Sequence, residues 1–131
     1  MKTILVDAVN TAIVKNGEGK FVKFQELFDL LETYPNNKII VTNANDEQMI
    51  EFGLNDVPYP VFTMKHNPDK PDPIYFKTLL EQYHFEPSDV IYFEHNPDAV
   101  ASAQSVDITT CHYNKDTRDL VALKDFLDNN L

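Results

Sequence analysis

Apolar runs alternate along this chain with segments in which apolar residues recur every three or four positions. Short, largely β-branched runs of this kind are typical of strands buried on both faces of a sheet. They predict five strands, at Lys2–Val9, Lys38–Asn43, Pro60–Met64, Asp89–Glu94 and Asp107–Tyr113. Helical spacing of apolar residues predicts the helices that alternate with them, at 24–34, 46–52, 73–83, 97–105 and 120–127.

Turn and capping residues separate these elements. Asn16-Gly17-Glu18-Gly19 lies between two short apolar pieces and predicts a hairpin within 12–22, beside the first strand. Gly53 stands where a helix C-cap is expected. Asp72-Pro73 and Asn96-Pro97 have the cap-then-proline order of helix starts.

Strands that alternate with helices through short connections predict an α/β fold. We expect a mostly parallel five-stranded sheet with helices on both faces, that is, a three-layer α/β/α Rossmann-like architecture with the first strand at the centre. A chain of 131 residues can bury one sizeable core. We therefore expect a single domain over residues 1–131.

Composition narrows the classes of partner. The net charge of −10 argues against nucleic acid, since duplex binding depends on clustered Lys and Arg. No segment is long and apolar enough to cross a membrane, and the N-terminal segment has no secretory-signal pattern, so the expected location is the cytoplasm. The one cysteine, Cys111, is expected to be a buried structural thiol.

Polar residues stand at the ends of several predicted strands. Asp7, Thr42 and Glu94 each follow an apolar run, and Lys70 lies in a loop before a helix. Because the carboxyl ends of parallel strands share one edge, where α/β proteins bind ligands, we expect these four residues to line one crevice.

In this order the four positions resemble the motifs of the haloacid dehalogenase-like (HAD) superfamily, and the resemblance covers nearly the whole chain. Asp7-Ala8-Val9-Asn10-Thr11 matches its Asp-x-Asp-x-Thr motif except at Val9, and Thr42 matches its strand-end hydroxyl. Lys70-Pro71-Asp72-Pro73 matches its lysine motif, and Phe93-Glu94-His95-Asn96-Pro97 loosely matches its acidic motif.

The resemblance implies a Mg²⁺-dependent phosphatase that acts through an aspartyl phosphate. Asp7 would be the nucleophile, and Thr42 and Lys70 would hold phosphoryl oxygens. Asp7, the backbone carbonyl of Val9 and Glu94 would hold the Mg²⁺. The partner would be a phosphorylated small molecule or macromolecule.

Two departures from the motifs change this expectation. The family has an acid–base aspartate where this chain has Val9, and its loss removes a contribution of roughly 10²–10⁴-fold to the rate. Glu94-His95 replaces the usual acids, with Ala99 where a further acid often follows, so Mg²⁺ binding is expected to be weak or absent. We therefore expect weak turnover or a pseudoenzyme.

Several alternatives stay open at this stage. A non-catalytic binding or regulatory module would use the crevice for an anion or a protein partner. The dehalogenase branch carries a bulky residue at the position of Val9 and needs no metal, but also has a helical cap, for which this chain has no room. The sequence favours His95 as a polar loop residue over an acid or metal ligand, and His66, His84 and His112 as surface or strand residues.

Overall fold

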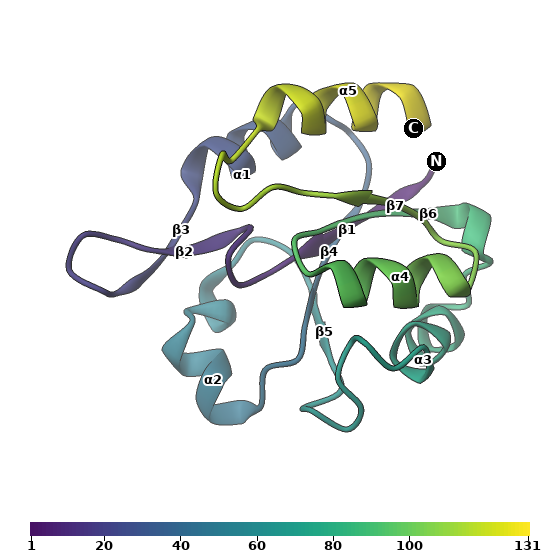
Figure 1. Cartoon of the computed structure of the whole chain (residues 1–131), viewed down its shortest axis with the longest axis horizontal. Coiled ribbons are helices and arrows are strands. Elements are labelled where there is room, and N and C mark those ends of the chain that lie inside the picture. The colour runs from purple at the N-terminus through teal and green to yellow at the C-terminus, as the bar shows by residue number, and fades with distance from the viewer.

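A parallel sheet forms the centre of the molecule, which a computed structural model describes over residues 1–131 (Figure 1). Its five strands are β1 (Thr3–Asp7), β4 (Lys38–Thr42), β5 (Val61–Thr63), β6 (Val90–Glu94) and β7 (Thr109–His112). They lie in the order β5-β4-β1-β6-β7, and every pairing is parallel. The predicted sheet and the central place of its first strand are confirmed.

Helices cover both faces of the sheet. The five α-helices are α1 (Gln25–Glu32), α2 (Asp46–Glu51), α3 (Ile74–Tyr83), α4 (Pro97–Ser105) and α5 (Leu120–Asn130). Helices α1 and α5 lie on one side of the sheet and α3 and α4 on the other (Figure 1). The architecture is the predicted three-layer α/β/α sandwich.

Alternation along β1 divides the apolar core in two. Ile4 and Val6 pack with the apolar residues of α1 and α5. Leu5 points to the other face and packs with α3 and α4. Because successive side chains of a strand point to opposite faces, Asp7 follows Leu5 toward the α3 and α4 side, at the carboxyl end of the strand.

The predicted hairpin follows β1 and consists of β2 (Ile13–Lys15) and β3 (Phe21–Lys23). It projects from one end of the molecule, and Phe21 packs edge-on against Phe52 with the ring centroids 4.7 Å apart (Figure 1). Between Asp7 and Thr42 the chain forms only this hairpin and α1, so no cap domain lies over the sheet edge.

Some element boundaries differ from the prediction. The first strand ends at Asp7 instead of Val9, because the chain turns through Asn10, which has a φ of 72°. Asparagine tolerates this left-handed conformation better than most residues. Helix α3 begins at Ile74, one residue later than expected, and Asp72 Oδ1 accepts a hydrogen bond from the Ile74 amide at 3.0 Å.

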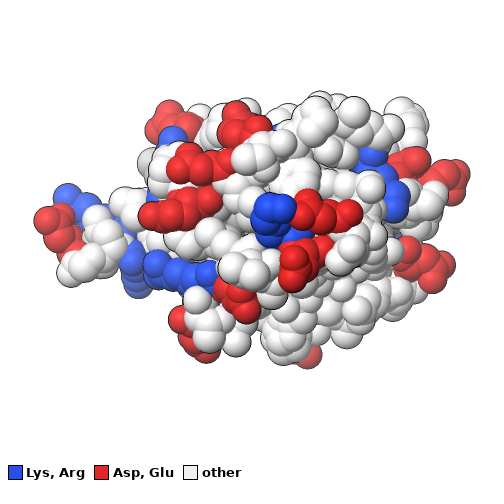
Figure 2. All heavy atoms as spheres, turned by 90° about the horizontal axis from the view of Figure 1, so that it is seen from above, with Lys and Arg blue, Asp and Glu red and all other residues white.

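Acidic side chains are dispersed over the face covered by α1 and α5 instead of gathering in one patch (Figure 2). No helix combines the length and apolar character needed to span a bilayer. Cys111 is half-buried in β7, less than predicted, and burial raises the pKa of its thiol.

Candidate functional site

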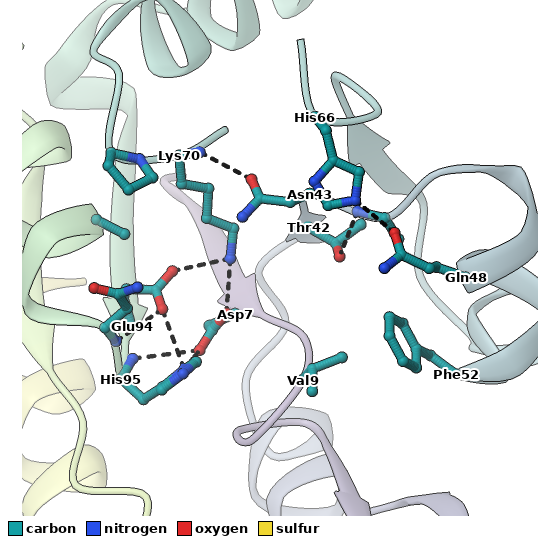
Figure 3. Close-up of a pocket in the computed structure, with 14 residues that line it drawn as sticks. Asp7, Val9, Thr42, Asn43, Gln48, Phe52, His66, Lys70, Glu94 and His95 are labelled. Carbon is teal, nitrogen blue, oxygen red and sulfur yellow. Dashed lines mark hydrogen bonds and ion pairs between the residues drawn. The ribbon is translucent and has the colours of Figure 1, made fainter. Parts of the chain in front are cut away.

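A crevice of about 150 Å³ opens at the carboxyl edge of the sheet (Figure 3). Its walls include all the residues that the sequence placed there, together with Val9 and His95. The predicted members of the set are Asp7, Thr42, Lys70 and Glu94, which come from β1, β4, the loop before α3, and β6.

The sheet brings the two carboxylates together. Val6 of β1 lies opposite Phe93 of β6, so the next residues, Asp7 and Glu94, leave neighbouring strands side by side. Both residues are only 1% exposed. Two buried carboxylates that lie side by side require cationic partners, because an unpaired buried charge costs on the order of several kcal/mol.

Both oxygens of Asp7 already have partners. Oδ1 accepts from Lys70 Nζ at 2.7 Å, and Oδ2 accepts from the Thr11 hydroxyl at 2.6 Å. Oδ2 also accepts from the His95 amide at 3.3 Å and contacts His95 Nδ1. Burial alone would raise the pKa of Asp7, but Lys70 and His95 hold it below its usual range, so the carboxyl is ionised.

Both oxygens of Glu94 are engaged as well. Oε1 accepts from Lys70 Nζ at 2.9 Å and from the Tyr92 hydroxyl. Oε2 accepts from the Asn96 amide at 3.0 Å and lies 3.2 Å from His95 Nδ1. Glu94 is therefore held by its own strand, by the following helix start and by two basic side chains.

Lys70 is 5% exposed and bridges the two carboxylates. Burial lowers the pKa of its ammonium group, but Asp7 and Glu94 outweigh that effect and raise it. The Lys70 amide donates to Asn43 Oδ1 at 2.8 Å, which fixes the loop before α3 to the end of β4. Lys70 is thus a fixed cation at the floor of the crevice.

Thr42 lines another side of the crevice. Its Oγ1 accepts from the Ala44 amide at 3.2 Å, so its own hydroxyl hydrogen remains available to a ligand. Its carbonyl accepts from the buried Tyr75 hydroxyl at 2.7 Å, which fixes the end of β4.

Val9, which stands at the position of the expected acid–base residue, lies in an apolar part of the crevice wall. Val9 and Phe52 lie near each other on the side of the crevice opposite Glu94 (Figure 3). Neither side chain carries a titratable proton. A leaving group on this side would therefore meet apolar surface.

His95 is more than the polar loop residue that the sequence favoured. Its Nδ1 contacts Asp7 Oδ2 and lies 3.2 Å from Glu94 Oε2, with 19% of the side chain exposed. Burial lowers its pKa, but hydrogen bonds to Asp7 and Glu94 outweigh this and raise the pKa of His95 to about 9. The other histidines, His66, His84 and His112, are exposed, as expected, but His66 also lines the crevice, where its Nε2 contacts Gln48 Oε1.

The groups expected to hold Mg²⁺ do not fit that ion in this arrangement. Mg²⁺ needs near-ideal octahedral oxygen coordination at about 2.0–2.1 Å. The oxygens that face away from Lys70 are Asp7 Oδ2 and Glu94 Oε2, and both already contact His95. Asp7, Glu94 and His95 offer ligand atoms within 4.8 Å of one another, but an ion among them would have to displace the imidazole.

Sequence reasoning gave no role to three residues that shape the site. Tyr92 is two residues before Glu94 on the same strand, and this spacing puts both side chains on one face, so the signal was present. Asn43 directly follows Thr42 and holds the Lys70 loop. Thr11 belongs to the predicted motif without a role of its own, and its hydroxyl donates to Asp7 Oδ2.

No protein-family model and no curated protein matches the sequence. Solved structures do match. A HAD family enzyme from Bacteroides thetaiotaomicron, a mutant in complex with magnesium and inorganic phosphate, is 14% identical with a TM-score of 0.67, over 88% of this chain and 95% of that one.

Two matches come from Streptococcus pneumoniae TIGR4. The core domain of a proposed phosphoglycolate phosphatase is 15% identical with a TM-score of 0.63, over 97% of this chain and 95% of that one. A hydrolase is 22% identical with a TM-score of 0.63, over 82% of this chain and 58% of that one. At these identities the matches show the fold, and the chain has the HAD-like fold.

Proposed function

We propose that the protein takes a phosphoryl group into the crevice and transfers it to Asp7, with slow turnover of the resulting aspartyl phosphate. The observation that carries this proposal is the convergence of an ionised, buried Asp7 with Lys70 and the Thr42 hydroxyl in one crevice. The HAD-like fold, and the phosphate bound to one structural neighbour, support it.

The first step uses Asp7 Oδ1. This oxygen has Lys70 as its one hydrogen-bond partner and keeps a lone pair for attack on phosphorus. A bond forms between Oδ1 and phosphorus while the bond from phosphorus to the leaving oxygen breaks. Lys70 and the Thr42 hydroxyl offset the negative charge on the phosphoryl oxygens.

Protonation of the leaving group is the weak point of this step. Val9 and Phe52 supply no proton, and both ring nitrogens of His66, which also lines the crevice, are engaged with Asp69 and Gln48. The leaving oxygen therefore departs as an anion and takes its proton from water. The reaction therefore favours leaving groups that are stable as anions, such as phenolates and carboxylates. The apolar wall suits an aromatic leaving group.

Hydrolysis of the aspartyl phosphate is slow for the same reason. A water molecule must attack phosphorus, and no side chain at the Val9 position can take its proton. We expect the phosphorylated protein to accumulate, which would be observed as a burst followed by slow release of phosphate.

A second candidate function is anion binding without chemistry. It is favoured by the engagement of all four carboxylate oxygens of Asp7 and Glu94, which leaves the nucleophile partly committed to other groups. Such a module would bind inorganic phosphate, a phosphorylated molecule or a phosphorylated protein partner and leave it unchanged.

Incubation with an aryl phosphate and with acetyl phosphate tests the proposal, in EDTA and in Mg²⁺. Intact-mass spectrometry would detect a phosphorylated protein, and hydroxylamine would remove an acyl phosphate. Peptide mapping of the wild-type protein identifies the phosphorylated residue, and this result does not depend on whether a variant folds. Asp7→Asn should abolish phosphorylation, whereas Asp125→Asn, an exposed change in α5, should leave it intact.

The outcomes separate the two candidates. Phosphorylation at Asp7 with slow release supports the proposed function. Phosphate binding measured by calorimetry, without phosphorylation, supports the anion-binding module instead. Absence of both binding and phosphorylation would overturn both.

A further inference from the structure

His95 lies where the two buried carboxylates of the crevice come together. Its Nδ1 contacts Asp7 Oδ2 and is 3.2 Å from Glu94 Oε2 (Figure 3). Carboxylate oxygens of an ionised acid can only accept hydrogen bonds, so this contact requires a hydrogen on Nδ1. The ring nitrogen therefore faces the carboxylates as a donor and not as a lone pair.

All four carboxylate oxygens of Asp7 and Glu94 have a basic partner. On one side, Lys70 Nζ donates hydrogen bonds to Asp7 Oδ1 and Glu94 Oε1. On the other side, His95 Nδ1 contacts Asp7 Oδ2 and lies close to Glu94 Oε2. Each basic residue thus bridges both acids, and the two acids are satisfied without any ion from solution.

Hydrogen bonds on both sides of His95 fix the backbone from which the ring projects. The His95 amide donates to Asp7 Oδ2 at 3.3 Å, and its carbonyl lies 2.9 Å from His112 Nε2. The next residue, Asn96, caps α4 by accepting from the Asp98 amide at 2.9 Å. The backbone of His95 is thus tied to β1, β7 and α4, and the ring starts from a fixed point when it contacts the two carboxylates.

We propose that His95 takes the place of a divalent cation between Asp7 and Glu94, so that this protein works without Mg²⁺ and a single substitution at His95 would open a metal site. The proposal deepens the proposed function by removing the metal from it. It names His95 as a positioning residue that acts through Asp7.

Metal binding of the folded protein tests this directly. Calorimetric titration of the wild-type protein with Mg²⁺ should give no heat of binding at the site. Electron paramagnetic resonance should show that Mn²⁺ added to the wild-type protein stays free in solution. His95→Asp offers a carboxylate in place of the imidazole and should bind one Mg²⁺ or Mn²⁺, at least about tenfold more tightly than the wild type.

His84→Asp is the matched control. It makes the same substitution at an exposed position that ends α3 with a φ of 57°, a conformation that Asp tolerates. It should bind no more metal than the wild type. If His95→Asp folds only with metal present, its thermal midpoint should rise with Mg²⁺ while those of the wild type and His84→Asp stay constant.

Nitrogen-15 spectra of the His95 ring in the wild type give an answer that needs no variant. The ring signals should not move when Mg²⁺, Mn²⁺ or Zn²⁺ is added. A shift at Nδ1 on addition of Zn²⁺ would show that His95 is a metal ligand and would overturn the proposal.

Two further results would also overturn it: stoichiometric Mg²⁺ binding by the wild type, or no gain of metal binding in His95→Asp and in His95→Asn. Phosphorylation of Asp7 is a separate measurement. Mg²⁺-dependent phosphorylation would contradict this inference and leave the proposed function standing, whereas no phosphorylation under any condition would contradict the proposed function alone.

Discussion

Val9 lines the crevice, and in the proposed phosphoryl transfer to Asp7 it stands where a proton donor would reach the leaving group. We predict that Val9→Asp raises turnover of an aryl phosphate, because it restores an acid that can protonate the leaving oxygen and later activate water. Such a group contributes roughly 10²–10⁴-fold to the rate. Steady-state release of the aryl alcohol measures the change.

Val22→Asp provides the control for this variant. Val22 lies in β3 and is 39% exposed, so the same substitution adds a carboxylate on the hairpin surface. Turnover should stay at the wild-type level. Equal rates for Val9→Asp and the wild type would show that the missing acid does not limit the reaction.

Tyr92 supports the site from inside the sheet by donating its hydroxyl hydrogen to Glu94 Oε1. Hydrogen bonds to charged groups contribute roughly 1.5–3 kcal/mol. We predict that Tyr92→Phe lowers the free energy of unfolding by about this amount, as measured by urea denaturation. Tyr83→Phe, at a half-buried position, should change it by less than about 0.5 kcal/mol.

The residue scale also shows how far the sequence predicts the crevice. Asp7, Thr42 and Glu94 end parallel strands, and the topology alone forces them to one edge. The role of His95 depends on the direction of one side chain in a loop, and no periodic pattern specifies that direction. Its contact with Asp7 joins residues 88 positions apart and follows from tertiary structure.

At the scale of elements, helix α2 is followed by Gly53 in the left-handed conformation, which favours glycine. Gly53 has a φ of 68°, and a methyl group there would meet no atom within 4 Å. We predict that Gly53→Ala lowers the free energy of unfolding by about 1–2 kcal/mol through backbone strain alone. Urea denaturation with an unchanged slope would measure this.

Gly17 is the matched control, because it is equally open but has no positive φ. Gly17→Ala should stay within about 0.5 kcal/mol of the wild type. Equal losses for the two variants would show that the positive φ of Gly53 adds no strain to an alanine at that position.

Element types were predictable here and element ends were not. Uninterrupted apolar runs identify β1, β4 and β6 because strands buried on both faces need them. The first strand nevertheless ends two residues before the apolar run does. Val9 lies beyond the end of β1 and lines the crevice, and hydropathy does not distinguish an apolar residue there from one in the sheet.

At the scale of the whole molecule, the crevice does not share the negative net charge of the chain. The net charge is −10, yet the crevice holds Lys70 and His95 against two acids and is locally close to neutral. A phosphoryl group must approach an acidic surface, so its binding should depend on these fixed cations and not on long-range attraction. That residues 1–131 form one domain stays a prediction.

The six tyrosines report on the integrity of the whole fold, because every one has a pKa raised above 10.0 and burial is the largest cause. The pKa of Tyr34 rises to about 12, with the Asp128 carboxylate adding to the effect of burial. A raised pKa means that folding favours the neutral phenol. The resulting stability is complete below the unfolded pKa, near 10, and is lost as the pH rises above it.

We therefore predict that absorbance at the tyrosinate wavelength stays low in the folded protein as the pH passes 10, and then rises together with the loss of the circular dichroism of the fold. In concentrated urea the same residues should titrate near pH 10. Superimposable titration curves for the folded and the urea-unfolded chain would contradict the full burial of Tyr75, Tyr92 and Tyr113 and the partial burial of the other three.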